Sequence, residues 1–98
     1  MSVQSFNLLP DRIEVTLEVF DFRSIEVGFV EDNAPVDLTD WTLSILGPTW
    51  ITVTVQDVVN GRVLLEFKPT TKAKNEYSLL AVKDTDSRVL LTGQAESV

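Results

Sequence analysis

Apolar and polar residues alternate one by one along much of this sequence. From Ile13 to Val19 every second residue is Ile, Val or Leu, and the residues between them are Glu or Thr. This period of two places the apolar side chains on one face of a β-strand and the polar side chains on the other. Val, Ile and Thr, which favour strands, occupy 28 of the 98 positions, whereas Ala occupies 4. The pattern therefore predicts strands nearly everywhere and no helix of ordinary length.

Turn-forming residues divide the chain into a series of short strands. Gly47-Pro48 and the polar segment 69–75 are connections, and Asn60-Gly61 suits a two-residue hairpin turn with positive φ at both positions. The strands are expected at 13–19, 25–29, 41–45, 51–56, 62–68, 76–83 and 88–96. About seven strands with turn signals about every ten residues predict an all-β, antiparallel sandwich, and a closed barrel is the main alternative.

The length of 98 residues and the apolar content of 44% predict one domain with a hydrophobic core. We assign residues 13–98 to this domain and residues 1–12 to an extended N-terminal arm. Phe6, Leu8 and Leu9 lie on the arm, outside the expected sheets, and an apolar arm usually docks on another surface. No apolar run approaches the ~20 residues of a membrane span, and no signal peptide is recognisable. We therefore expect the chain in a cytoplasm or on a particle assembled there.

Charge and residue content exclude several classes of function. The formal net charge of −7 argues against binding to a phosphate backbone, which requires clustered Lys and Arg. Without Cys or His, the chain has no thiol nucleophile, no zinc site of the usual kind and no Ser-His-Asp triad. Asp84 and Asp86 alternate as in a calcium loop, but the central Gly and the closing Glu of that loop are missing. We expect no enzyme, no cofactor and no metal site.

Some strands carry apolar residues on both faces. Leu64, Leu80, Val82 and Leu90 each adjoin another large apolar residue, so if one neighbour is in the core the other faces outward. On neighbouring strands these four side chains would form an apolar patch of the size that marks an interface. We expect this patch, or the arm residues Phe6, Leu8 and Leu9 folded over it, to contact another subunit. The alternative is that the strands have a different phase and some of these side chains lie at strand ends.

The aromatic residues suggest one binding candidate and two structural roles. Trp41 is in phase with Leu43 and Ile45, which predicts a place in the core. Trp50 begins a strand and is a possible exposed aromatic for binding a sugar ring. Tyr77 opens the sixth expected strand, where sandwich domains often place a Tyr whose hydroxyl bonds to nearby backbone.

Four short motifs resemble a known group of proteins. They are Pro35-Val36-Asp37-Leu38-Thr39-Asp40-Trp41-Thr42, Asn60-Gly61-Arg62-Val63, Glu76-Tyr77-Ser78-Leu79 and Leu90-Leu91-Thr92-Gly93. In this order they resemble small immunoglobulin-like structural proteins of tailed bacteriophages, including the N-terminal domain of siphophage upper-baseplate proteins. The resemblance extends over residues 13–98. It departs from that group's pattern at Asp40, where Gly is usual, and at Asn75-Glu76, which replaces the Gly before Tyr77.

The resemblance implies an immunoglobulin-like β-sandwich and a non-catalytic role in the virion. The chain would be an assembly or adaptor subunit of the tail or baseplate, or a capsid-decorating (cement) protein. Its partners would be other virion proteins and further copies of itself in a homo-oligomer, with no nucleic acid, membrane or small-molecule substrate. The alternative from the residues is a carbohydrate- or protein-binding sandwich module that uses loop aromatics.

Overall fold

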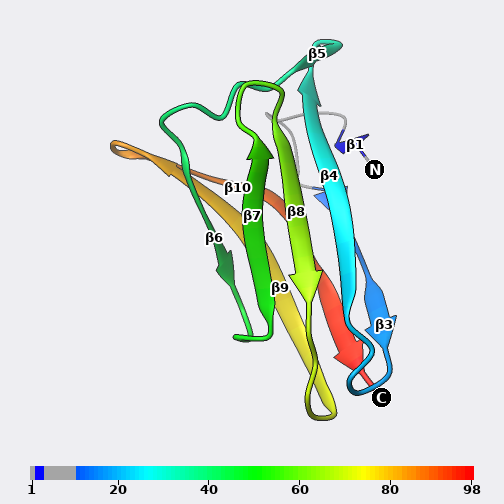
Figure 1. The fold of residues 1–98 in the computed structure, drawn as a ribbon. Coiled ribbons are helices and arrows are strands. Elements are labelled where there is room, and N and C mark those ends of the chain that lie inside the picture. Colours follow the sequence, from blue (N-terminus) through cyan, green and yellow to red (C-terminus); the bar gives the residue numbers. More distant parts are fainter. Residues whose placement is uncertain (1, 4–10) are drawn as a thin grey trace.

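The computed structural model describes residues 2–3 and 11–98, and these form two β-sheets packed face to face (Figure 1). Sheet A has the order β1-β4-β8-β7, with β5 paired to β4, and sheet B has the order β2-β10-β9-β6, with β3 paired to β10. The predicted all-β sandwich is confirmed. The strands are β1 (Ser2–Val3), β2 (Asp11–Arg12), β3 (Val15–Leu17), β4 (Arg23–Glu31), β5 (Ala34–Pro35), β6 (Thr42–Leu46), β7 (Ile51–Asp57), β8 (Arg62–Phe67), β9 (Ala73–Lys83) and β10 (Asp86–Ser97).

The strand order is that of an immunoglobulin constant-type sandwich. In that topology one sheet contains the first, second, fifth and fourth strands, and the other contains the third, sixth and seventh. Here β1, β4, β8 and β7 take the first set of positions, and β6, β9 and β10 take the second. The beginning of the chain contributes to both sheets, because β1 pairs with β4 whereas β2 and β3 pair with β10. These three pairings are parallel, so the sandwich is not antiparallel throughout as the sequence predicted.

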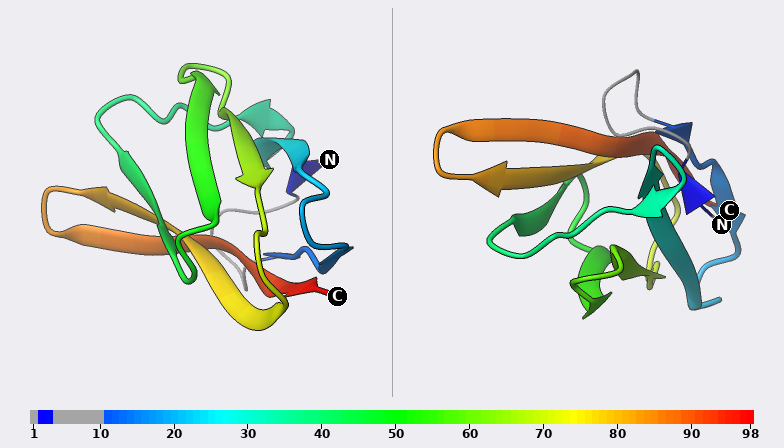
Figure 2. Two further views of the ribbon diagram at one scale, coloured as in Figure 1. Left: turned by 60° about the horizontal axis from the view of Figure 1, so that its bottom comes forward. Right: turned by 90° about the horizontal axis from the view of Figure 1, so that it is seen from above.

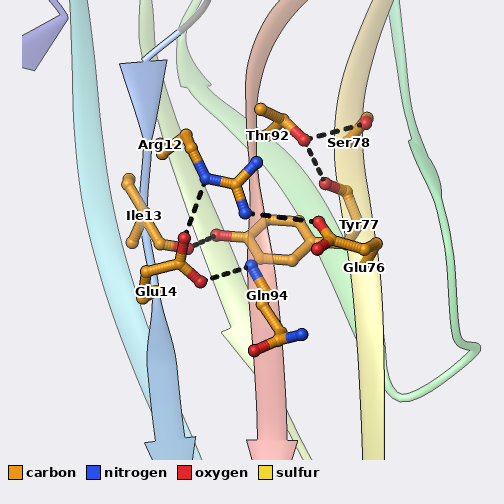
Figure 3. A network of polar contacts seen from close by, with 8 residues as sticks. All are labelled: Arg12, Ile13, Glu14, Glu76, Tyr77, Ser78, Thr92 and Gln94. Carbon is orange, nitrogen blue, oxygen red and sulfur yellow. Dashed lines mark hydrogen bonds and ion pairs between the residues drawn. The ribbon is translucent and has the colours of Figure 1, made fainter.

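The strand expected at 13–19 is shortened to β3 at Val15–Leu17, and Ile13 and Glu14 interrupt the segment between β2 and β3 (Figure 3). The Ile13 amide donates to the Thr92 carbonyl at 2.9 Å, but the Ile13 carbonyl accepts a hydrogen bond from the Tyr77 hydroxyl at 2.8 Å. The Gln94 amide on β10 donates instead to the Glu14 carboxylate at 2.9 Å. The Tyr77 hydroxyl therefore bonds to backbone 64 residues upstream, not to nearby backbone as the sequence suggested.

Two glycines occupy positions where a side chain does not fit. A Cβ added to Gly93 would lie 1.9 Å from the Ile13 carbonyl oxygen, so the close crossing of that segment over β10 requires Gly. Gly61 has a φ of 64°, and a Cβ there would lie 2.5 Å from the Val36 carbonyl oxygen. Gly61 ends a turn of four residues between β7 and β8, and Asn60 does not have positive φ. The two-residue turn predicted at Asn60-Gly61 is therefore wrong.

The Asp57 side chain explains why this turn is longer. Its two carboxylate oxygens accept hydrogen bonds from the Asn60 main-chain amide at 3.3 Å and the Asn60 side-chain amide at 2.8 Å. These bonds stabilise the charged carboxylate and lower the pKa of Asp57. They also hold Asn60 inside the turn, which includes Val58 and Val59 in addition to the Asn60-Gly61 pair.

The core lies between the sheets and is built from the inward residues of each strand. Tyr77, Phe67 and Leu79 are at most 1% exposed, and the Phe67 and Tyr77 rings meet edge to face with centroids 5.7 Å apart. Trp41 lies just before β6 and only partly inside, packed against the core. The core residues are Ile13, Leu17, Val27, Phe29, Leu38, Ile51, Val63, Leu65, Phe67, Tyr77, Leu79, Ala81, Leu90, Leu91 and Ala95.

Candidate interaction surface

The apolar patch predicted from the sequence is divided between the two sheets. Leu64 lies on β8 in sheet A, whereas Leu80 and Val82 lie on β9 in sheet B, so they face opposite sides of the molecule. Leu64 is half-buried between Glu26 on β4 and Thr54 on β7, which are its partners in the sheet register. It is therefore a single apolar side chain on a polar face and not part of a patch with the other two.

Leu90 is a core residue and does not face outward. The register between β9 and β10 shifts between Val89 and Leu91, which leaves Leu90 as the extra residue of a β-bulge. The bulge lets Leu90 and Leu91 both point inward, with exposures of 3% and 0%. Strict alternation along β10 assigns Leu90 to the outer face, and that prediction is wrong because alternation assumes an unbroken ladder.

Four residues form an apolar group on the outer face of sheet B. Leu80 is opposite Val89 on β10, and Leu46 on β6 is opposite Ser78, the outward neighbour of Leu80 on β9. Leu46 and Val89 are 53% and 41% exposed, while Leu80 and Val82 are half-buried. We call Leu46, Leu80, Val82 and Val89 the sheet B apolar group.

Only two members of the sheet B apolar group, Leu80 and Val82, were predicted from the sequence pattern. Val89 was missed because the bulge at Leu90 reverses the phase of β10. Leu46 directly follows the inward residue Ile45, so two adjacent apolar residues interrupt the alternation at the end of β6. The same kind of adjacent pair led to the prediction of Leu80 and Val82. An adjacent apolar pair at a strand end thus also places one apolar side chain on the outer face.

The β9–β10 hairpin extends beyond the strands of sheet A (Figure 2). Lys83 and Arg88 lie on its inner side, in phase with the buried Ala81. Lys83 Nζ lies 5.9 Å from the centroid of the Trp41 ring, and the Arg88 guanidinium carbon lies 5.8 Å from it. Distances of this size allow cation–π attraction. Trp41 therefore joins the loop before β6 to both strands of the hairpin, and it provides less of the core than the sequence predicted.

The carboxylate of Asp37 is held by Thr39, two residues further along the loop between β5 and β6. The Thr39 hydroxyl and the Thr39 amide both donate to Asp37 Oδ1, at 2.5 Å and 2.8 Å. These hydrogen bonds lower the pKa of Asp37, and the nearby Lys83 lowers it further. Asp37 thus has a local structural role in an Asx-type turn.

The other residues predicted from the sequence as binding or interface candidates are Trp50 and three residues of the N-terminal arm. Trp50 is half-buried and packs against the core, so part of its ring is unavailable to a ligand. Phe6, Leu8 and Leu9 lie outside the described residues. Within residues 2–3 and 11–98, no three His, Cys, Asp or Glu side chains are close enough together to hold a metal ion, and no helix is long and apolar enough to cross a bilayer.

A polar network surrounds the Tyr77 hydroxyl (Figure 3). Arg12 Nε donates to Glu14 Oε1 at 2.8 Å, and a second guanidinium nitrogen lies 3.4 Å from Glu76 Oε2. Burial raises the pKa of Tyr77 to about 12, with a further rise from Glu14 that Arg12 partly offsets. A phenol that holds its proton this firmly serves as a hydrogen-bond donor and not as a base.

Comparison with known proteins gives a likeness of fold. No family model and no curated protein matches the sequence. Among solved structures, the chain is similar to an endo-fucoidan hydrolase from glycoside hydrolase family 107, with a TM-score of 0.60 and 14% sequence identity. The similarity covers 89% of this chain and 12% of that chain, so it concerns one module of a much larger protein. At this identity it supports the β-sandwich assignment alone.

Proposed function

We propose that this chain is a non-catalytic structural subunit of a tailed-phage particle. It would act as an adaptor in the tail or baseplate, or decorate the capsid, by binding other virion proteins. The proposal extends the resemblance of the four sequence motifs to immunoglobulin-like phage proteins. The sandwich with immunoglobulin strand order is compatible with it.

The observation that carries the proposal is the sheet B apolar group. An outer sheet face of a solvated sandwich normally alternates to polar residues, and a concentration of apolar side chains there marks a contact with another protein. Ser44, Ser78 and Ser87 are opposite Leu80, Leu46 and Val82 in the register, so small polar side chains alternate with the apolar ones on this face. A virion protein with an apolar sheet face or strand is the partner that this surface fits.

The same surface gives the proposal a direct test. We would purify the phage particle that carries this gene and measure the copy number of the chain by quantitative mass spectrometry. A fixed copy number per particle is expected, and absence from the particle would overturn the proposal. The chain with Leu80→Ser and Val89→Ser should then be incorporated less than the wild type. Leu64→Ser, a half-buried leucine on the outer face of sheet A, serves as the matched control.

Catalysis is tested separately. The likeness to one module of an endo-fucoidan hydrolase gives a specific substrate to try, because fucoidan is what that protein's name describes. We expect no release of reducing ends from fucoidan by the purified chain. Cleavage that persists after repurification would contradict the non-catalytic part of the proposal and leave the virion location to be decided by the copy number.

A further inference from the structure

Strand β7 forms an edge of sheet A that lacks the usual protection against pairing. It pairs with β8 on one side, and within the described residues no strand pairs with its other side. Natural edge strands usually carry Lys, Pro or an early bulge that discourages a second chain. The stretch from Thr49 to Gln56 contains no charged residue, no Pro and no Gly, and the register shift of β7 comes only after Val55.

The backbone groups that face the open edge can be identified from one hydrogen bond. The Lys68 amide donates to the Trp50 carbonyl at 2.9 Å, so these opposed residues form a hydrogen-bonded pair. Hydrogen-bonded and non-hydrogen-bonded pairs alternate along an antiparallel ladder. Ile51, Val53 and Val55 therefore do not bond to β8, and their N–H and C=O groups point away from it. The Ile51 N–H already donates to the Pro48 carbonyl at 3.3 Å, so a new ladder has to use the Ile51 carbonyl and the N–H and C=O groups of Val53 and Val55.

The residues at this edge are complementary to themselves in one register. If two β7 strands run antiparallel about a two-fold axis at Val53, Val53 is opposite its own copy and Ile51 is opposite Val55 of the second copy. Thr52 is then opposite Thr54 of the second copy, on the outer face of the joined sheet. The N–H and C=O groups of Val53 meet those of the other Val53, and the Val55 N–H meets the Ile51 carbonyl of the second copy, because these residues coincide with the hydrogen-bonded pairs of the new ladder. The Val55 carbonyl faces the Ile51 N–H of the second copy, which already donates to Pro48.

Charge also favours a second copy at this edge. Each chain has a net charge of −7, so two copies repel one another over most approaches. The uncharged stretch of β7 is a place where they meet without opposed carboxylates. The pairing would also cover Val55, which is 38% exposed in the single chain, with Ile51 of the second copy.

We propose that two copies of this chain associate through antiparallel pairing of their β7 strands in the register centred on Val53. The two A sheets then become one continuous sheet. This interface is separate from the sheet B apolar group, which lies on the other sheet and remains available to a different partner. The inference does not depend on a virion location, and either proposal can fail without the other.

A charge-exchange experiment tests the register. Thr52 and Thr54 are exposed, so charged residues are tolerated in the single chain. Thr52→Lys with Thr54→Lys places like charges opposite one another in both symmetric pairs, whereas Thr52→Lys with Thr54→Glu places opposite charges there. In sedimentation-velocity experiments over a concentration series, we expect the Lys/Lys variant to have a dimer dissociation constant at least about tenfold above that of the Lys/Glu variant.

Disulfide trapping gives an independent measurement, because the natural chain contains no Cys. Thr52→Cys and Thr54→Cys are prepared as separate proteins and mixed under mild oxidation. Opposed residues in a non-hydrogen-bonded pair have Cα atoms about 4.5 Å apart, within the range of a disulfide. The mixture should give a crosslinked dimer, and each protein alone should give little, because identical positions are offset by two residues in this register.

The possible results decide the question. A wild-type dimer that responds to charge as described, with crosslinking in the mixture, supports the proposal. A wild-type chain that stays monomeric over the whole concentration series overturns it. Equal dimer dissociation constants for the two charge variants also overturn it. The dimer interface would then lie at the edge strand β6 or at the sheet B apolar group. Unchanged thermal unfolding of the variants shows that they remain folded.

Discussion

Replacing Tyr77 with Phe removes one hydroxyl and keeps the ring. The hydroxyl donates to the Ile13 carbonyl at 2.8 Å in a site where Tyr77 is 1% exposed, so the carbonyl loses its buried partner. Leaving a buried acceptor unpaired costs about 1–3 kcal/mol. The edge-to-face contact with Phe67 remains, so the loss reports the hydrogen bond and not a cavity. For a domain of this size each kcal/mol lowers Tm by about 4–8 °C.

Urea unfolding followed by tryptophan fluorescence measures this loss. The midpoint should fall while the slope with urea stays the same, because the variant exposes the same surface on unfolding. Thr16→Val removes an exposed hydroxyl from β3 and should change the free energy of unfolding by less than about 0.5 kcal/mol. If Tyr77→Phe were as mild as this control, the hydrogen bond to Ile13 would not hold the interrupted strand in place.

The same residue predicts a change of stability at alkaline pH. Tyr77 has a pKa of about 12 in the folded chain against a reference value of 10.0, chiefly because it is buried. A raised pKa means that its contribution is fully present below about pH 10 and is lost as the pH rises towards 12. The loss is about 2 kcal/mol at the upper end of this range. The difference in stability between wild type and Tyr77→Phe should therefore shrink between pH 10 and 12, and a constant difference would contradict the assignment.

Two further substitutions test the packing of β10. Gly93→Ala should destabilise the chain by at least about 2 kcal/mol, because the added Cβ would meet the Ile13 carbonyl oxygen and displace the first strands. Chemical denaturation measures this loss. An unchanged free energy of unfolding would exclude the close crossing of Ile13 over β10. Leu90→Ala should cost about 2–5 kcal/mol, as for a core leucine, whereas Leu64→Ala should cost clearly less because Leu64 is only half-buried. Equal losses for the two leucine variants would place Leu90 outside the core.

The regular strands were predictable because each has one buried and one exposed face. Val27, Leu65 and Leu79 are all fully buried, as the period of two requires. The interruption at Ile13 was not predictable, since a regular strand and a broken one have the same alternation there. What decides between them is the Tyr77 hydroxyl, 64 residues away, which gives the Ile13 carbonyl a partner outside the ladder.

The interaction surface was harder to predict than the fold. Adjacent apolar residues showed that some side chains had to face outward, and Leu80 and Val82 do lie on an outer face. The alternation pattern does not show which strands pair in the same sheet. It therefore could not show that Leu64 lies on the other sheet from Leu80 and Val82. It also gave no sign of the bulge at Leu90, because two adjacent leucines fit either a bulge or a two-sided strand.

The parallel pairing of β3 with β10 determines how the domain responds to tension. Val15–Leu17 lie beside Ala95–Ser97 and run in the same direction. If the chain is pulled from the N-terminal side of β3 and from Val98, the two forces act in opposite directions along the parallel strands. All the hydrogen bonds between β3 and β10 are then loaded together in shear. An antiparallel pair pulled from the same end would open one bond at a time. The β3–β10 pair thus resists mechanical extension of the chain more strongly than an antiparallel pair of the same length would.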